Sequence, residues 1–338
     1  MKKLLITLLS ILIIASSLSG CKSNEDIKVY KTPVTNTNFM FDTVTSISIY
    51  SAKKDKNPDE ILGETINMCR ALEKKLSKTI DTSDVSLINN SKGEPVQVSE
   101  ETIELINLSK KYYTLSNGSF DITIAPLSEK WNFKNKDVKP LSDEEIQHLL
   151  PYVGMDFIEI DGNTVRKTNP NSQIDLGGIA KGYIADKTAE YLKSKGVTSA
   201  LINFGGNIVI IGNKPEGQPF KIGIQKPFSE ANDIIGFINS ENGTVVTSGS
   251  YERYFEYEGK KYHHILDPKT GKPAESGVTS VTIQCENSAD ADAISTACFV
   301  LGAEKGIEFI DSLDGVEAVF ITDSGEIIKS KGSTFEEV

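Results

Sequence analysis

The 338-residue chain has little of the material from which common metal and nucleotide sites are built. It contains three histidines and four cysteines without a Cys-x-x-Cys pair, so a zinc site is not expected. No Gly-x-Gly-x-x-Gly run follows an apolar strand, and no phosphate-binding Gly-Lys-Ser/Thr loop occurs, which excludes both common nucleotide-binding fingerprints. Three cysteines remain beside Cys21, an odd number that argues against a disulfide framework; Cys69 and Cys298 fit buried free thiols.

Positive charge is also scarce. Asp and Glu outnumber Lys and Arg by 47 to 36, which gives a formal net charge of −11. Because nucleic-acid surfaces need Lys and Arg to neutralise phosphates, nucleic acid is not an expected partner. Beyond the N-terminus no apolar run is long enough to span a bilayer, and the roughly 300 residues that follow suffice for one large domain.

The N-terminal segment has the pattern of an export signal. Lys2 and Lys3 precede an apolar stretch that ends in Leu18-Ser-Gly-Cys21, which resembles a bacterial lipobox. We expect residues 1–20 to be a lipoprotein signal peptide and Cys21 to carry the lipid, with residues 21–35 as a polar tether. The domain would then span 36–338, anchored to the bacterial cell membrane and facing outside the cytoplasm. A plain signal peptide is the alternative.

The remaining pattern mixes strands and helices without strict alternation, which indicates an α+β domain rather than a doubly wound sheet. Expected strands include Met40–Tyr50 and Ala200–Ile211, and a hairpin is expected over Tyr254–Leu266. Helices are expected to begin at Asn57-Pro58, Ser99 and Ser142, and to cover Ile179–Lys195 and Ala289–Leu301.

The run Ile174-Asp-Leu-Gly-Gly-Ile-Ala-Lys-Gly-Tyr183 carries the most chemistry. It places an acid, two glycines and a lysine where an apolar strand turns into a helix. Glycines leave the backbone open to close approach, and a helix N-terminus favours a phosphate. Asp175 and Lys181 are therefore candidate ligand-binding residues, although Gly-Gly turns before helices also occur without a function.

Two further segments are weaker signals. Gly118-Ser-Phe-Asp-Ile-Thr123 joins a helix end to an expected strand, where an aromatic ring beside polar groups fits a stacked ligand or an ordinary core strand. Asn203-Phe-Gly-Gly-Asn207 places two glycines inside a strand pattern, which marks either a close ligand or a β-bulge.

Acid–base and metal-binding groups come late in the chain. Strand alternation puts His263 and His264 on opposite faces, so only one of them can enter a site as an acid–base group. Asp292 and Thr296 are four residues apart on one helical face, and their oxygens suit Mg²⁺. The alternative for this helix is capping by Asp290 with a solvated Asp292.

Taken in order, these segments resemble the ApbE family of FAD:protein FMN transferases. The resemblance runs from about Phe39 to the C-terminus and implies a single ApbE-like (T-fold-related) domain of mixed sheets and packed helices. The shared motifs are Met40-Phe-Asp-Thr43, Ser119-Phe-Asp-Ile-Thr123, Asp175-Leu-Gly-Gly-Ile-Ala-Lys-Gly182, Asn203-Phe-Gly-Gly-Asn207, His264-Ile-Leu-Asp-Pro268 and Asp292-Ala-Ile-Ser-Thr-Ala297.

The resemblance implies a Mg²⁺-dependent transfer of FMN from FAD to a Ser or Thr of an acceptor protein, with a phosphoester bond formed and AMP released. The acceptor would be an exported flavoprotein, a redox pump subunit or an FMN-binding domain, carrying Asp-x-x-Ser/Thr-Gly/Ser-Ala-Ser/Thr. The implied FAD contacts are Met40, Ser119, Phe120, Asp121, Asp175, Lys181 and Ile265; the implied metal contacts are Gly178, Ala289, Asp292 and Thr296.

Within this scheme His264 is the expected catalytic histidine, Lys181 would stabilise charge on the leaving AMP, and Asp175 is an alternative base. Phe41-Asp42 stands where the family often has a single glycine, and Thr79 where it often has tyrosine. Two other functions share every residue named: an FAD pyrophosphatase that yields FMN and AMP, and a non-enzymatic flavin-binding lipoprotein.

Overall fold

An eight-stranded antiparallel sheet forms the centre of the computed structural model, which describes residues 26–229 and 233–338. The signal peptide, Cys21 and the start of the tether lie outside the described residues. In spatial order the strands are β1 (Ile27–Met40), β2 (Thr43–Lys53), β6 (Val197–Phe204), β7 (Asn207–Ile211), β10 (Gly243–Gly249), β13 (Val278–Cys285), β14 (Glu317–Thr322) and β15 (Ile327–Lys329).

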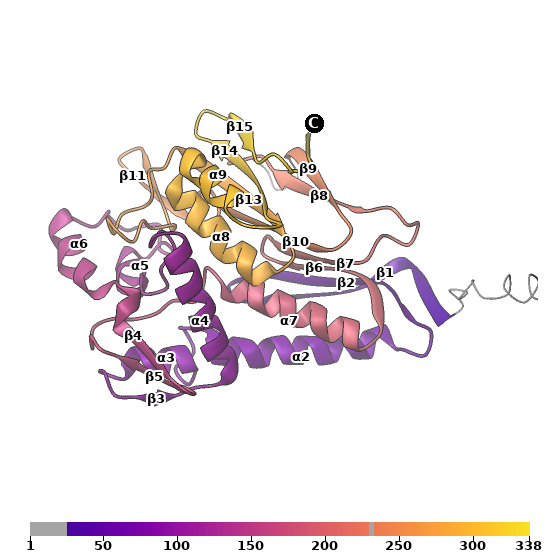
Figure 1. The fold of residues 1–338 in the computed structure, drawn as a ribbon, viewed down its shortest axis with the longest axis horizontal. Coiled ribbons are helices and arrows are strands. Elements are labelled where there is room, and N and C mark those ends of the chain that lie inside the picture. Colours follow the sequence, from indigo (N-terminus) through magenta and orange to yellow (C-terminus); the bar gives the residue numbers. More distant parts are fainter. Residues whose placement is uncertain (1–25, 230–232) are drawn as a thin grey trace, which may run out of the picture.

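Helices cover one face of this sheet (Figure 1). Their apolar stripes pack against the strands or against neighbouring helices; Leu62, Cys69 and Leu72, for example, are buried on the first helix. Cys69 and Cys298 are buried free thiols, as expected. The covering helices are α2 (Pro58–Leu76), α4 (Glu100–Leu115), α7 (Ala180–Ser194), α8 (Ser288–Leu301) and α9 (Ala303–Asp311).

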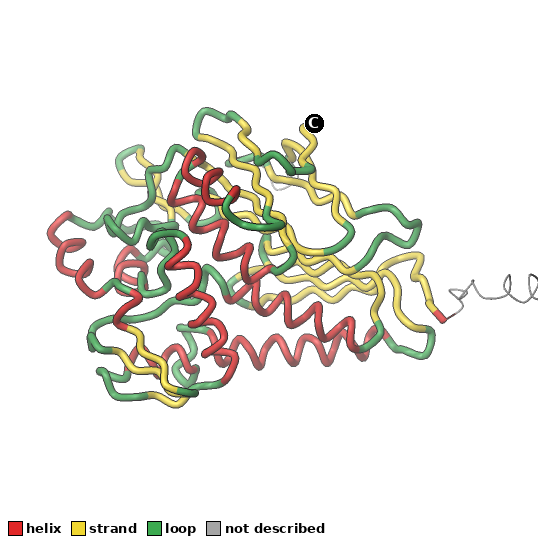
Figure 2. The backbone as a smooth tube through the Cα atoms, viewed as in Figure 1, coloured by secondary structure: helices red, strands yellow, loops and turns green. Residues whose placement is uncertain are grey.

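A smaller antiparallel sheet packs on the other face, so the main sheet is buried between two layers (Figure 2). Its strands are β16 (Phe335–Glu337), β9 (Ile234–Ser240) and β8 (Phe220–Gln225). Alternate residues of β8, Phe220, Ile222 and Ile224, are buried against the main sheet.

The remaining elements gather beyond one end of the main sheet (Figure 1). They are α3 (Asp84–Asn90), α5 (Ala125–Trp131), α6 (Asp143–Leu149), the short 3₁₀ turns Leu150–Tyr152 and Met155–Phe157, the sheet β3 (Val96–Gln97), β5 (Thr164–Lys167) and β4 (Ile158–Asp161), and the hairpin β11 (Tyr254–Tyr257) and β12 (Lys260–His263).

The architecture confirms the α+β class, the five expected helices and the hairpin that turns at Glu258-Gly259. Two local expectations were wrong. Residues 27–35 are not tether, because they form the first half of β1 and pair with β2. Residues 119–124 form a turn rather than a strand, since Asp121 caps the turn and α5 starts with Ala125-Pro126. Within the described ranges no helix has the length and apolarity needed to cross a bilayer.

Candidate active site

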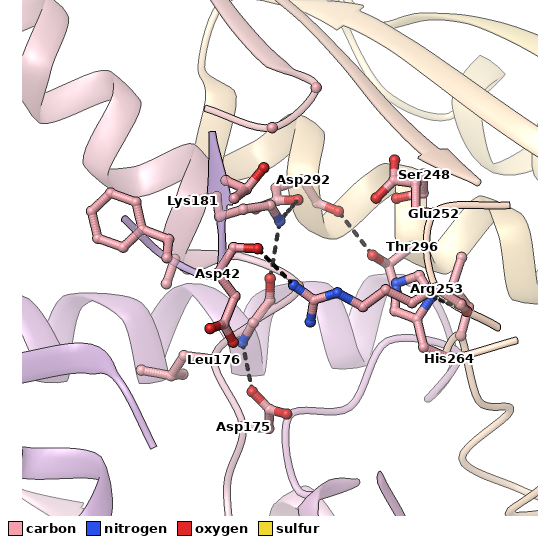
Figure 3. A pocket seen from close by; sticks show the side chains of 18 of the residues that line it. Asp42, Asp175, Leu176, Lys181, Ser248, Glu252, Arg253, His264, Asp292 and Thr296 are labelled. Atoms are coloured by element: carbon pink, nitrogen blue, oxygen red, sulfur yellow. Dashed lines mark hydrogen bonds and ion pairs between the residues drawn. The ribbon is translucent and has the colours of Figure 1, made fainter. Parts of the chain in front are cut away.

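A cavity of about 1080 Å³ opens beyond the end of the main sheet. All six motif segments contribute to its walls, although they are spread over more than two thirds of the chain. Figure 3 shows Asp175, Lys181, His264, Asp292 and Thr296 around this space. Ser119, Phe120, Asp121, Gly178 and Ile265 also line it.

The turn that contains Asp175 is held from outside the motif. One Asp175 carboxylate oxygen lies 2.9 Å from Lys78 Nζ, and the other accepts the Gly177 N–H at 2.8 Å. Burial alone raises the pKa of Asp175, but the Lys78 charge and these hydrogen bonds outweigh it and hold the pKa below its usual value. Asp175 is therefore an ionised, paired anchor for the turn.

Two polar side chains, the half-buried Asn89 and the buried Lys167, hold the chain that leads into this turn. Asn89 accepts the Ile174 N–H at 2.7 Å and donates to the Ile174 carbonyl at 2.9 Å. Lys167, which is 1% exposed, donates its ammonium group to the carbonyls of Asn89, Pro170 and Ser172. These bonds replace the water that both side chains lose, so the approach to the turn is rigid.

Ser119, Phe120 and Asp121 form the neighbouring wall. The Asp175 N–H donates to the Ile122 carbonyl at 2.7 Å, which joins this segment to the Asp175 turn. The Asp121 carboxylate accepts from the Thr123 backbone and hydroxyl, while burial raises its pKa to about 6. The Phe120 ring lies 3.3 Å from where a side chain on Gly178 would begin, so a larger residue at this position would press on the ring and narrow the turn.

The opposite wall depends on a close crossing of α7 and α8. A Cβ atom on Gly182 would lie 2.1 Å from the Ser288 carbonyl oxygen, so only glycine permits this approach. The approach lets the Gly182 N–H donate to Asp292 at 3.1 Å, and it places Lys181 Nζ 3.5 Å from the same carboxylate. Asp292 is only 3% exposed, and the Thr296 hydroxyl donates to its main-chain carbonyl at 3.1 Å.

The capping alternative for α8 was wrong. Asp186 on α7 accepts the backbone N–H groups of Ser288 and Ala289, both at 2.8 Å, and so caps α8 from the neighbouring helix. Asp292 is buried at the helix crossing rather than solvated.

His264 and Arg253 enter the cavity as a pair. They lie just beyond the paired ends of β11 and β12, and the Arg253 carbonyl accepts both the His264 backbone N–H at 3.1 Å and its ring Nδ1 at 3.2 Å. Because a carbonyl only accepts, the proton lies on Nδ1 and Nε2 keeps its lone pair. Burial, reinforced by the Arg253 charge, lowers the pKa of His264 to about 3, so its ring is neutral at neutral pH.

Alternation separates the two histidines as expected. His263 lines a second cavity, where its Nε2 lies 3.1 Å from the Ala274 carbonyl and its Nδ1 is buried without a partner. Burial lowers the pKa of His263 as well. His264 is therefore the histidine that can act in the main cavity.

Two expected contacts lie behind the cavity wall rather than on it. The Met40 side chain is 3% exposed and packs in the core, while Phe41, Asp42 and Thr43 line the cavity in its place. The reason is the two-residue hairpin turn after Met40, in which Phe41 and Asp42 both adopt left-handed backbone angles. Ala289 is buried in the first turn of α8 and does not line the cavity either.

Several lining residues were missed from the sequence. Lys78 follows the end of α2 beside Thr79, which was noted in the sequence but not assigned to the site, and Glu252 and Arg253 follow β10 in a polar loop that carries no motif by itself. Crowding by protein atoms, opposed by the Lys181 charge, raises the pKa of Glu252 to about 7, although the residue is still exposed to solvent. The sequence feature that could have found Arg253 is the expected hairpin over Tyr254–Leu266, because such a hairpin places the residue before Tyr254 opposite His264.

The oxygens at the α7–α8 crossing suit a magnesium ion. Asp292 supplies one carboxylate, Thr296 a hydroxyl and Gly178 a carbonyl; a Cβ on Gly178 would lie 3.5 Å from the Thr296 hydroxyl. Among the described residues no group of three or more His, Cys, Asp or Glu side chains is arranged as metal ligands. The donor set therefore fits a cation that completes its shell with water and substrate phosphate, as Mg²⁺ does.

Comparison with known proteins shows the family to which the chain belongs. The ApbE family model matches residues 41–320. The FAD:protein FMN transferase of Klebsiella pneumoniae is 36% identical over 278 residues, which cover 80% of this chain and 85% of that protein. The FAD:protein FMN transferase of Treponema pallidum is 31% identical over 306 residues, 86% of this chain and 84% of that protein.

Solved structures share the fold over nearly their whole length. The crystal structure of the ApbE protein from Thermotoga maritima matches with a TM-score of 0.82 at 34% identity, covering 88% of this chain and 97% of that one. The flavin transferase ApbE from Vibrio cholerae matches with a TM-score of 0.80 at 28% identity and the same coverage.

Proposed function

The chain belongs to the ApbE family, and from that premise we propose that it is an FAD:protein FMN transferase. The observation that carries the proposal is the convergence of all six motif segments on one cavity of about 1080 Å³, which suits a ligand of dinucleotide size. The finer proposal is a Mg²⁺-dependent reaction in which a Ser or Thr hydroxyl of the acceptor attacks the FMN phosphorus. The bond from that phosphorus to the bridging oxygen breaks, and AMP leaves.

The cavity must accept an anionic substrate despite an acidic lining. Seven carboxylates and four Lys or Arg cations line it, so two phosphate groups would meet excess negative charge. A bound Mg²⁺, held by Asp292, Thr296 and Gly178, would supply the missing positive charge and orient the diphosphate. Lys181 and the N-terminus of α7 would lie near the same phosphates.

The acceptor hydroxyl must lose its proton as the new phosphoester bond forms. His264 suits this role better than Asp175, because the neutral ring keeps a lone pair on Nε2 that the Arg253 carbonyl leaves available. Both oxygens of the Asp175 carboxylate are already engaged, one with Lys78 at 2.9 Å and the other with the Gly177 N–H at 2.8 Å, so Asp175 is committed to holding the turn. We assign the base role to His264 and an anchoring role to Asp175.

The test combines the protein, FAD, Mg²⁺ and an exported flavoprotein domain with an Asp-x-x-Ser/Thr-Gly/Ser-Ala-Ser/Thr segment. We expect the acceptor mass to rise by one FMN, and the gain to disappear when EDTA removes the metal or alanine replaces the acceptor Ser or Thr. AMP released with an unmodified acceptor would instead support the pyrophosphatase. FAD that binds without any AMP release would support a flavin-binding lipoprotein.

We also propose that the chain acts at the outer side of the bacterial cell membrane, held by a lipid on Cys21. The lipobox-like residues 18–21 support this proposal. Cys21→Ser should release the protein from the membrane fraction of expressing cells, while Cys69→Ser should leave it there. Equal membrane retention of both variants would refute the anchor.

A further inference from the structure

Four cations line the main cavity, and three of them already have carboxylate partners. Lys78 lies 2.9 Å from Asp175, Lys181 lies 3.5 Å from Asp292, and Lys134 pairs with Asp42. The fourth cation is Arg253. No ion pair within residues 26–229 and 233–338 includes it, and its guanidinium donates only to the Asp42 main-chain carbonyl, at 3.3 Å.

The position of Arg253 in the cavity also indicates a role in substrate binding. Figure 3 shows its side chain extending between His264 on one side and Lys181 and Asp292 on the other. The Arg253 backbone accepts from His264, so the two residues lie opposite each other across the hairpin and share a face. A guanidinium offers several N–H donors in a plane, which matches the paired oxygens of a phosphate.

We propose that Arg253 binds the diphosphate of FAD and stabilises the negative charge that develops on the phosphate of the leaving AMP. This inference rests on the proposed transferase function and names the residue that receives the substrate's charge. When the acceptor oxygen bonds to the FMN phosphorus, the bridging oxygen departs with AMP and carries the electron pair of the broken bond. Arg253 donates to that phosphate, while the acceptor's proton passes to His264.

Lys181 is less suited to this task alone, because its ammonium group already contacts Asp292 and the Gly177 carbonyl at 3.2 Å. Among the described residues the Arg253 guanidinium has one hydrogen-bond partner, a neutral carbonyl, so its other N–H groups can donate to a phosphate while that bond is kept. The contact with Asp42 has a second consequence. It connects Arg253 to the β1–β2 turn, so the guanidinium is held at the cavity wall before the substrate arrives.

Four forms of the protein test the proposal: wild type, Arg253→Gln, Arg253→Lys and the control Arg166→Gln. Arg166 is exposed on β5, pairs with Glu159 and does not line the cavity. FAD affinity is measured by flavin fluorescence without metal or acceptor, so no turnover occurs. Transfer rates are measured with Mg²⁺ and acceptor, and thermal unfolding reports whether each variant is folded.

We expect Arg253→Gln to weaken FAD binding by roughly tenfold to a hundredfold, the usual effect of losing a charge-assisted hydrogen bond. Its transfer rate at saturating FAD should fall by a further factor of about 100, because charge stabilisation is lost in the transition state. Arg253→Lys should recover part of both losses since it keeps the charge. Arg166→Gln should match wild type.

FAD affinity and transfer rates within twofold of wild type for a folded Arg253→Gln would overturn the proposal. A lowered unfolding temperature with unchanged FAD affinity would also overturn it, because Arg253 would then only brace the Asp42 turn. If Arg253→Gln does not fold, the Arg253→Lys variant decides the question. An FAD affinity and a transfer rate constant equal to those of wild type in Arg253→Lys would then refute a paired guanidinium–phosphate contact. A wild-type chain that binds FAD but modifies no acceptor would refute the transferase and leave the affinity comparison valid.

Discussion

Two of the three lysine–aspartate pairs that line the main cavity, Lys78–Asp175 and Lys181–Asp292, are held in different ways. In the Lys78–Asp175 pair the charged atoms are 2.9 Å apart and both side chains are about a quarter exposed. In the Lys181–Asp292 pair they are 3.5 Å apart, and the Asp292 side chain is only 4% exposed at a helix crossing. The first pair is a closed contact that fixes a turn. The second is a looser contact around a buried carboxylate, which suits a group that binds a cation.

Isosteric substitutions separate these two roles most strongly. We expect Asp292→Asn to lower the transfer rate by at least about 100-fold, a loss of roughly 3 kcal/mol in transition-state stabilisation, because it removes the charge that holds the metal. Asp175→Asn should mainly raise the FAD concentration needed for half-maximal rate. Steady-state kinetics with FAD varied would check both expectations, and equal losses in rate constant would show that the two pairs act alike.

The helix crossing beneath Asp292 can be broken by one methyl group. Gly182→Ala puts a Cβ against the Ser288 main chain, and we expect a stability loss of about 3 kcal/mol. Gly63→Ala on α2 is the matched control, since no atom lies within 4 Å of its added Cβ; it should gain about 0.5–1 kcal/mol. Urea unfolding measures both changes. Similar unfolding midpoints for the two variants would contradict the close crossing.

The Asp175 turn has its own distant support in Lys167. Lys167→Met removes the ammonium group and leaves the carbonyls of Asn89, Pro170 and Ser172 without this donor, at a cost of about 1–3 kcal/mol. FAD affinity should also fall, because the chain leading into the turn loosens. Lys331→Met, on an exposed lysine, is the control for urea unfolding. Wild-type FAD affinity in Lys167→Met would show that the turn holds without this support.

The smallest effect concerns pH. Because the Asp175 pKa is lowered in the folded protein, its pairing stabilises the fold above the unfolded-state pKa near 4, and that stability is lost as pH falls through the folded-state value. We expect Asp175→Asn to destabilise the protein by less than about 1 kcal/mol at pH 7. The difference from wild type should shrink toward pH 3. A difference that grows on acidification would contradict the Lys78–Asp175 pairing.

The two pairs also show how far the sequence alone could be interpreted. Lys181, Gly182 and Asp292 belong to local patterns with recognisable spacing, and the structure brings them together. Lys78 lies far from Asp175 in the sequence and Lys167 only eight residues before it, but neither belongs to a motif, because their roles depend on tertiary contacts. The α+β class and most elements followed from periodicity and caps.

The differences between the sequence-based expectations and the structure also have local physical causes. β1 begins within the expected tether because its polar, alternating residues form an edge strand with only one hydrogen-bonded neighbour. Met40 lies in the core because the chain reverses directly after it, a turn built from Phe41 and Asp42 rather than from glycine. Arg253 carries no sequence signal until the hairpin places it beside His264.

The central claim is that this cavity moves FMN from FAD to a protein hydroxyl. The most direct measurement is the ratio of released AMP to covalently attached FMN in one reaction with FAD, Mg²⁺ and acceptor. We predict one AMP for each attached FMN, with both products lost in Asp292→Asn. AMP in excess of attached FMN, or AMP released equally without acceptor, would contradict the transferase and identify water as the nucleophile.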